Sequence, residues 1–237
     1  MDNSLMGHEE EHRDVAAGTQ RAAIFGISDG LVTNVSLILG FAGANPSASL
    51  VRLAGIAGLV AGAFSMASGE YLSMQAQREL FDRELTIERK ALAENPEIER
   101  KELISIYKSK GLDEKLAMDL ADAMMRNPEM ALETHAREEL GIDPGSTGSP
   151  WAASWISFLL FSVGAFIPLI PWLFTGGTTA IIISIVLSGI AALGIGALLG
   201  RYTGRSKTVS ALRQLGVATL AAGVTFGIGR LVGVSTL

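Results

Sequence analysis

The sequence predicts an all-α membrane protein with five transmembrane helices per subunit and a small helical domain inserted between the second and the third. The chain of 237 residues is 49% hydrophobic and 18% charged, with a mean hydropathy of +0.36, which is too apolar for an ordinary soluble domain. The acidic residues are also segregated, since 17 of the 24 lie between Glu79 and Asp143 and five lie in the first 14 residues. The apolar stretches therefore contain only two acids, Asp29 and Glu70.

Five stretches are long and apolar enough to cross about 30 Å of hydrocarbon as helices that rise about 1.5 Å per residue. We predict them at residues 22–44, 50–76, 151–174, 178–200 and 209–232. The chain is then divided into a polar tail (1–21), two spans (22–76), an acidic inserted domain (77–143), a linker (144–150) and three spans (151–237). The tail lacks the apolar core of a cleavable signal, so we expect the first span to direct insertion.

The inserted domain is predicted to consist of helices. No turn signal separates Ala76 from Gln77, so the second span is expected to continue to about Glu94 as one helix, roughly 66 Å long. Three shorter helices are expected at residues 96–110, 113–126 and 129–140, with Asn-Pro or Asp signals at or near their starts and Gly111 and Gly141 at two of their ends.

Basic residues predict how the chain is oriented. In a five-span arrangement the basic residues fall mainly on one side of the membrane, whereas the loop at residues 175–177, on the other side, has none. The basic residues of the tail and of the loop before the last span are Arg13, Arg21, Arg201, Arg205 and Lys207. The positive-inside rule then places the N-terminus and the inserted domain in the cytoplasm and the C-terminus outside. The chain has no cysteine, which excludes disulfides and thiolate metal sites.

The third span contains unusual residues near its ends. Trp151, Trp155 and Trp172 lie where interfacial anchors are expected. Pro168 and Pro171 are expected to bend or break the helix, because proline removes a backbone donor and its ring clashes with the preceding turn.

The second span carries the acid Glu70, which shares a helix face with Met66 and Met74 at a spacing of four residues. Carboxylate oxygen and thioether sulfur together suit a borderline metal ion such as Fe²⁺. Ionisable residues inside a span usually mark a transport pathway. The alternative is that the methionines are packing residues and Glu70 is a paired structural acid.

The first span carries Asp29, with Thr33 one helical turn further on the same face. Asp29 follows Arg21 by eight residues, and Glu70 precedes Arg78 by eight, so both acids are expected about 12 Å inside the same membrane face. We predict that they meet across the helix pair. Two carboxylates close together need a shared proton or cation, so a divalent ion that displaces protons there would be exchanged against them.

The acids of the inserted domain also occur at helical spacings, which would place each pair on one side of its helix. The pairs are Glu84 with Glu88, Glu99 with Glu102, and His135 with Glu139. Eleven Lys and Arg residues lie in the same region. Spacing alone is therefore consistent with either a metal site or a solvated acidic surface.

The tail segment from His8 to His12 matches the HExxH pattern of zinc proteases. Such a site needs a packed helix and a third ligand, and the chain has only one other histidine, His135. We therefore do not expect a protease. A solvated or surface-lying end is predicted instead, with weak adventitious metal binding as a lesser alternative.

The segments DGLVTN (29–34), SMASGEY (65–71), PEIERKEL (96–103) and IYKSKGL (106–112) together resemble the vacuolar iron transporter family. The resemblance covers nearly the whole chain from about residue 21. It implies a homodimeric, proton-coupled exporter of Fe²⁺ and related divalent ions such as Mn²⁺, with five spans per subunit. The ion and protons are then the partners, no cofactor is permanently bound, and no nucleic acid is involved.

The resemblance also implies roles for particular residues. Asp29 and Met66 would line the translocation path with Glu70 beside them. The carboxylates of the inserted domain would bind the metal; they are Glu88, Glu99, Glu102 and Glu139, with Glu84 as a neighbour. His135-Ala136 stands where plant members carry a methionine pair, so His135 is expected to substitute as a nitrogen ligand. The short tail and compact loops indicate a prokaryotic inner membrane.

Two other classes of function are considered. A ferritin-like, iron-oxidising membrane enzyme would need two Glu-x-x-His motifs on bundle helices, and the chain has only the one from Glu9 to His12 in the tail. A non-transporting membrane scaffold would present the charged domain to partners. Transport of metal by the isolated protein would distinguish a transporter from a scaffold.

Overall fold

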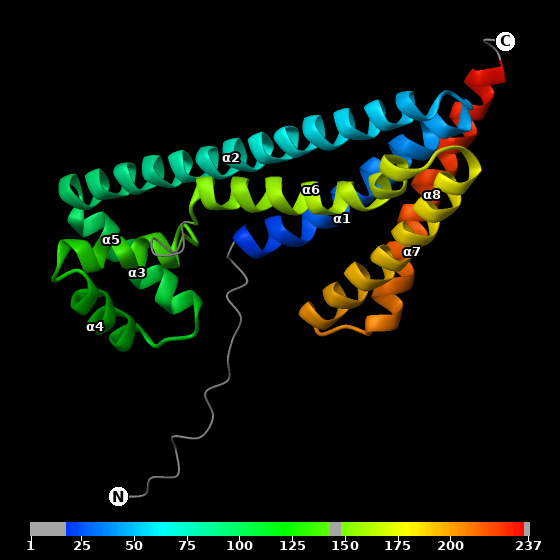
Figure 1. Cartoon of the computed structure of the whole chain (residues 1–237). Coiled ribbons are helices and arrows are strands. Elements are labelled where there is room, and N and C mark those ends of the chain that lie inside the picture. The colour runs from blue at the N-terminus through cyan, green and yellow to red at the C-terminus, as the bar shows by residue number, and fades with distance from the viewer. Residues whose placement is uncertain (1–17, 143–147, 235–237) are drawn as a thin grey trace, which may run out of the picture.

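A computed structural model describes residues 18–142 and 148–234 of the chain (Figure 1). Within these residues the structure is entirely helical. Five helices are long and apolar enough to cross a membrane, as predicted: α1 (Gly18–Gly43), α2 (Ala48–Glu94), α6 (Pro150–Phe174), α7 (Gly177–Tyr202) and α8 (Lys207–Val234). The HExxH segment of the tail, most of the predicted linker and the last three residues lie outside the described residues.

The second span and the segment that follows it form one uninterrupted helix, as predicted. α2 contains 47 residues, which corresponds to about 70 Å, more than twice the thickness of the hydrocarbon core. Its far part projects beyond the bundle and carries the inserted helices α3 (Pro96–Ser109), α4 (Glu114–Met124) and α5 (Pro128–Glu138) (Figure 1). We call these three helices and the projecting part of α2 the inserted domain.

The predicted ends of the inserted helices are confirmed by backbone geometry. Gly111 and Gly141 have φ angles of 96° and 64°, a left-handed conformation that glycine adopts without steric cost. At the start of α4, the side chain of Asp113 accepts a hydrogen bond from the Leu116 amide (3.0 Å), and Asn127 caps α5 in the same way. Local sequence therefore fixes where the chain turns.

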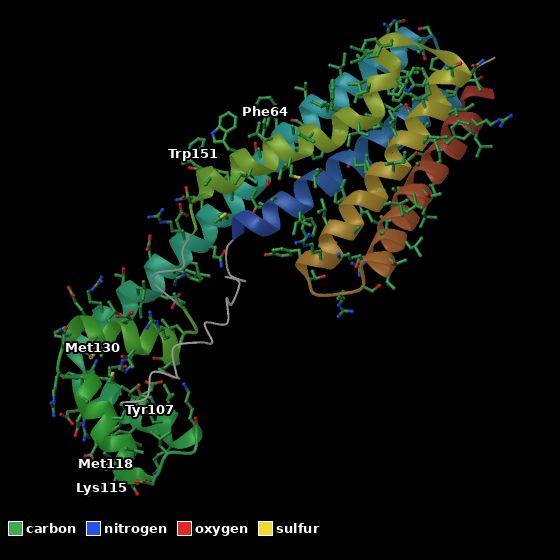
Figure 2. The ribbon with its side chains drawn as sticks, turned by 60° about the horizontal axis from the view of Figure 1, so that its bottom comes forward. Phe64, Tyr107, Lys115, Met118, Met130 and Trp151 are labelled. Carbon is green, nitrogen blue, oxygen red and sulfur yellow. The ribbon has the colours of Figure 1, made fainter. Side chains whose placement is uncertain are left out.

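A core of four side chains and an ion pair join α3 to α4. The core consists of Leu103 and Tyr107 from α3 and Ala117 and Ala121 from α4, and Figure 2 labels Tyr107. The guanidinium of Arg100 also pairs with the carboxylate of Asp122. These contacts hold α4 against α3.

The bundle is organised by close packing of α1 against α6. The two backbones approach so closely that a Cβ on Gly30 would lie 2.1 Å from the carbonyl oxygen of Phe161, and one on Gly164 would lie 2.1 Å from that of Ile27. Small residues at helix crossings allow this approach within a membrane. The close approach of the two backbones therefore fixes the position of α1 relative to α6.

Two predictions for the third span need correction. α6 is one helix through Pro168 and Pro171, so neither proline breaks it, and both are buried. The hydroxyl of Ser184 on α7 donates to the Pro168 carbonyl (2.8 Å) and joins α7 to this part of α6. Trp172 is not an interfacial anchor, since it is only 2% exposed and belongs to an apolar core with Ile38. Trp151 and Trp155 are exposed, as an anchor requires.

Candidate metal-binding sites

The carboxylates predicted in the inserted domain lie together where three helices meet. One ligand atom from each of Glu88, Glu99 and His135 lies within 4.8 Å of the other two, and the same holds for Glu99, Glu102 and Glu139. Glu99 belongs to both groups. We call these five residues the carboxylate cluster.

The positions of the helices explain this convergence. Glu88 comes from the projecting part of α2, which then turns at Asn95 into α3. Glu99 and Glu102 are three residues apart on α3 and so face the same side. α5 ends beside both helices and contributes the cluster's remaining residues. Only tertiary packing brings these three segments to one point.

The cluster contains both buried and exposed carboxylates. Glu88 and Glu99 are 6% and 8% exposed, whereas Glu102 and Glu139 face solvent. Oxygen Oε1 of Glu88 is buried and has no hydrogen-bond partner among the described residues. Because a buried, unpaired carboxylate is costly, this oxygen favours a bound proton or a bound cation.

The cluster raises the affinity of two of its carboxylates for protons. Burial, followed by the nearby Glu139, raises the pKa of the Glu88 carboxyl, and the charge of His135 opposes this. Burial and the nearby Glu102 raise the pKa of Glu139 in the same way. A divalent ion that binds here therefore competes with protons.

His135 is fully buried in the cluster, and both of its ring nitrogens face backbone oxygens. Nδ1 lies 2.9 Å from the Ala131 carbonyl oxygen and Nε2 lies 3.3 Å from that of Glu99. A doubly protonated imidazole would satisfy both oxygens and place a positive charge among the acids. A neutral imidazole could instead bind a metal through the nitrogen that carries no proton, after that nitrogen turns from its carbonyl.

Glu84 is not a member of either group of ligands. It is half-buried on α2, one turn before Glu88 and closer to the membrane. Glu84 therefore stands next to the cluster on the same helix, the position of a neighbour that the sequence predicted, and outside both groups of ligand atoms.

The second candidate site lies between the start of α1 and the middle of α2. Met66 and Glu70 of α2 line a small cavity of about 100 Å³ together with Ala22 and Phe25 of α1. The predicted pairing of thioether and carboxylate is present here. The methyl group of Met74 lies 2.9 Å from the position that a Cβ on Gly148 would take, and Met74 does not line this cavity.

Asp29 does not line the cavity of Met66 and Glu70. α1 and α2 are antiparallel, with Gly58 packed against Asn34 and with Glu70 in one cavity with Ala22 and Phe25. Asp29 follows these two residues of α1 by seven and four positions, so it lies one to two turns, about 6 to 10 Å, further along α1. The single chain thus does not bring the two acids into one cavity, and their meeting at one depth of a membrane stays a prediction.

Asp29 is exposed on the surface of the single chain, where the hydroxyl of Thr33 donates to its carboxylate (3.2 Å). The neighbouring residue Ser28 accepts a hydrogen bond of 2.6 Å from Gln214 of α8. Asp29 and Thr33 thus form one polar stripe, as predicted, on a helix that α8 holds in place.

The sequence reasoning did not single out Asn34, which the structure places at the centre of the bundle. Its side chain is fully buried and its amide donates to the carbonyl oxygen of Ala165 on α6 (2.6 Å). It is a positioning residue that joins α1 to α6 beside the stripe of Asp29. The sequence did contain a signal for this residue, because Asn34 is an amide side chain within an apolar span, five residues after Asp29.

Comparison with known proteins agrees with this geometry. The model of the VIT family matches residues 20–230. Vacuolar iron transporter 1 of Tulipa gesneriana is 30% identical over 232 residues, covering 98% of this chain and 94% of the relative. Vacuolar iron transporter 1 of Arabidopsis thaliana is 30% identical over 97% of this chain and 92% of its own length. The vacuolar iron transporter of Acanthamoeba castellanii is 36% identical, over 94% of this chain and 82% of its own length. The chain therefore belongs to the VIT family.

Proposed function

We propose that this protein is a proton-coupled transporter that moves Fe²⁺, with Mn²⁺ as a second substrate, out of the cytoplasm. The observation that carries the proposal is that a carboxylate cluster and a carboxylate-thioether cavity lie on the same continuous helix, α2. Along that helix Glu70 and Glu88 are about 27 Å apart. The names of the relatives, vacuolar iron transporters, support iron as the substrate.

The carboxylate cluster would collect the ion from the aqueous phase. Its oxygen ligands suit hard and borderline divalent ions, and its partial exposure at Glu102 and Glu139 gives access from solvent. The raised pKa values of Glu88 and Glu139 favour competition between the metal ion and protons at this cluster.

The membrane site would then pass the ion outward. Met66 supplies a thioether and Glu70 a carboxylate, and Asp29 with Thr33 offers the next oxygen ligands one to two turns further along α1. Carboxylates at successive depths would exchange an ion for protons stepwise along the path.

A homodimer would complete this path, because Asp29 faces outward on the single chain. A charged side chain at that depth is costly against lipid and is acceptable against a partner subunit or a water-filled path. In this proposal the N-terminus and the inserted domain are cytoplasmic, the C-terminus is outside, and the membrane is a prokaryotic inner membrane. The metal ion is the substrate, and the protein needs no resident cofactor.

Uptake of radioactive iron by vesicles that contain only this protein tests the proposal. We expect Fe²⁺ to accumulate when the vesicle interior is more acidic than the medium, and the interior to lose protons as metal enters. The variant Glu70→Gln should remove uptake, whereas the control Glu79→Gln, on the exposed continuation of the same helix, should keep it. Equal uptake by both variants and the unaltered protein would overturn the proposed path.

The same vesicles separate the transporter from the other two classes. Oxygen consumption that depends on Fe²⁺ and matches the iron added would indicate an iron-oxidising enzyme. A scaffold would give no uptake above that of empty vesicles, even though the protein is folded and inserted.

A further inference from the structure

A groove lined by aromatic side chains lies between α2 and α6, away from the cavity of Met66 and Glu70. Its volume is about 490 Å³, and Phe64, Tyr71, Leu72, Trp151 and Trp155 are among the residues that line it. Figure 2 shows Phe64 and Trp151 projecting from the same side of this helix pair. Its lining residues are distinct from those of either candidate metal site.

The groove runs from the membrane boundary into the apolar part of the bundle. At its outer end the rings of Tyr71 and Trp151 are 4.8 Å apart, next to the start of α6 at Pro150. Deeper in the bundle, Phe158 contacts both Trp155 (5.8 Å) and Phe64 (5.2 Å). Trp151 and Trp155 are 64% and 59% exposed, so the protein itself does not cover them.

Most polar side chains that line the groove are hydrogen-bond donors with no partner among the described residues. The indole N–H groups of Trp151 and Trp155 and the hydroxyls of Tyr71 and Ser68 form no hydrogen bond with the described residues. The hydroxyl of Ser154, in contrast, donates to the Ala67 carbonyl (2.8 Å). A ligand rich in acceptor oxygens would satisfy the groups that lack a partner.

A cation lies above the same groove. Arg78 follows Tyr71 by seven residues, which places it on the same face of α2 and about 10 Å further toward the inserted domain. Arg78 is exposed and forms no ion pair among the described residues, whereas the neighbouring Glu79 accepts a hydrogen bond from Gln75. A phosphate bound beside Tyr71 would therefore meet a cation on the same helix face.

We propose that this groove binds one glycerophospholipid per chain. An acyl chain would lie on the rings of Phe64 and Trp155, the ester oxygens would accept from the indole and phenol donors, and the phosphate would pair with Arg78. A second copy of this chain fits less well, since an apolar helix face brings few acceptors to these donors. The inference does not depend on the proposed transport.

Native mass spectrometry of the delipidated full chain in detergent tests this site. We expect titration with dioleoyl phosphatidylglycerol to give one saturable adduct per chain, and dioleoylglycerol, which lacks the phosphate, to bind at least about tenfold more weakly. Arg78→Gln and Trp155→Phe should each weaken the phospholipid adduct by about tenfold. Both positions are exposed, so folding should be preserved.

Matched control variants are available on the exposed surface of α7, away from the groove. Arg201→Gln at the end of α7 and Leu198→Ala on the exposed face of that helix should leave the adduct unchanged. Adducts of equal number and strength in every variant would overturn the site, since they would be general boundary lipid. Equal binding of both lipids, or dissociation of an oligomer in Trp155→Phe, would also overturn it, the latter by identifying a protein interface.

Discussion

The two candidate ion sites on α2 differ in how the chain builds them. Three separate segments converge to form the carboxylate cluster, and two of its acids are buried. The other candidate site is a small cavity between two helices, and Asp29 lies outside it and faces outward on the single chain. Under the proposed function, a single chain therefore suffices for the collecting site, whereas the translocation path would need a further surface.

The largest expected effect is on transport through the membrane site. Asp29→Asn should lower metal uptake by vesicles at least about 100-fold, because no charged oxygen then remains at that depth. Metal binding by the carboxylate cluster should be unchanged, as measured by calorimetry on the same sample. Loss of binding together with uptake would contradict the separation of the two sites.

The second largest effect is expected on metal binding by the carboxylate cluster, when Glu99, which belongs to both groups of ligands, is changed. Glu99→Gln should weaken metal binding more than Glu88→Gln or Glu102→Gln, because it removes a ligand from both groups. We expect a loss of at least about tenfold, or roughly 1.4 kcal/mol. Glu97→Gln, an exposed acid on the same helix, is the control. At saturating metal, the Glu99→Gln variant should still transport the ion. This result would separate collection of the ion by the cluster from its translocation through the membrane.

The sequence predicted the scaffold more completely than the sites. Helix bounds follow from local signals, such as Asn95-Pro96, Asp113 and the glycines at 111 and 141, and these were confirmed. The members of the carboxylate cluster were also named in advance, because spacing on each helix and the family resemblance both selected them. Their mutual distances depend on packing between helices, which no spacing within one helix specifies.

The relative position of Asp29 and Glu70 along the helix pair could not be predicted for a similar reason. Counting residues from Arg21 and Arg78 assumes that both arginines mark the same plane of the membrane. The actual register is set by the packing of Gly58 against Asn34, which shifts α1 along α2. Side-chain volume at a helix crossing, and not the position of flanking charges, decides such a shift.

A smaller effect is expected on the stability of the inserted domain, which should depend on pH. The native state holds protons on Glu88 and Glu139 more tightly than the unfolded chain does, because their pKa values are raised. This contribution to stability is fully present below the ordinary carboxyl pKa and is lost as the pH rises through the raised values. Without metal, the hydrogen-exchange protection of α5 should therefore fall with rising pH.

A variant and a metal titration sharpen this test. Glu88→Gln should make the metal-free domain less sensitive to pH, with a gain of roughly 1 kcal/mol on the alkaline side. Saturating divalent metal should reverse the pH trend, because the ion then binds the ionised carboxylates. A pH profile that is identical with and without metal would contradict a shared site for metal and protons.

The smallest expected effect concerns which metal ion the membrane cavity prefers. Met66→Leu keeps a similar volume and removes the thioether, so the packing around Ala22 and Phe25 should survive. Sulfur favours the softer ion, and we therefore expect Fe²⁺ uptake to fall by about fivefold while Mn²⁺ uptake changes little. Competition between the two ions in vesicles measures the ratio, with Met130→Leu on the exposed face of α5 as the control. An equal loss for both ions would mean that Met66 acts through packing, and selectivity would then have to reside in the carboxylates alone.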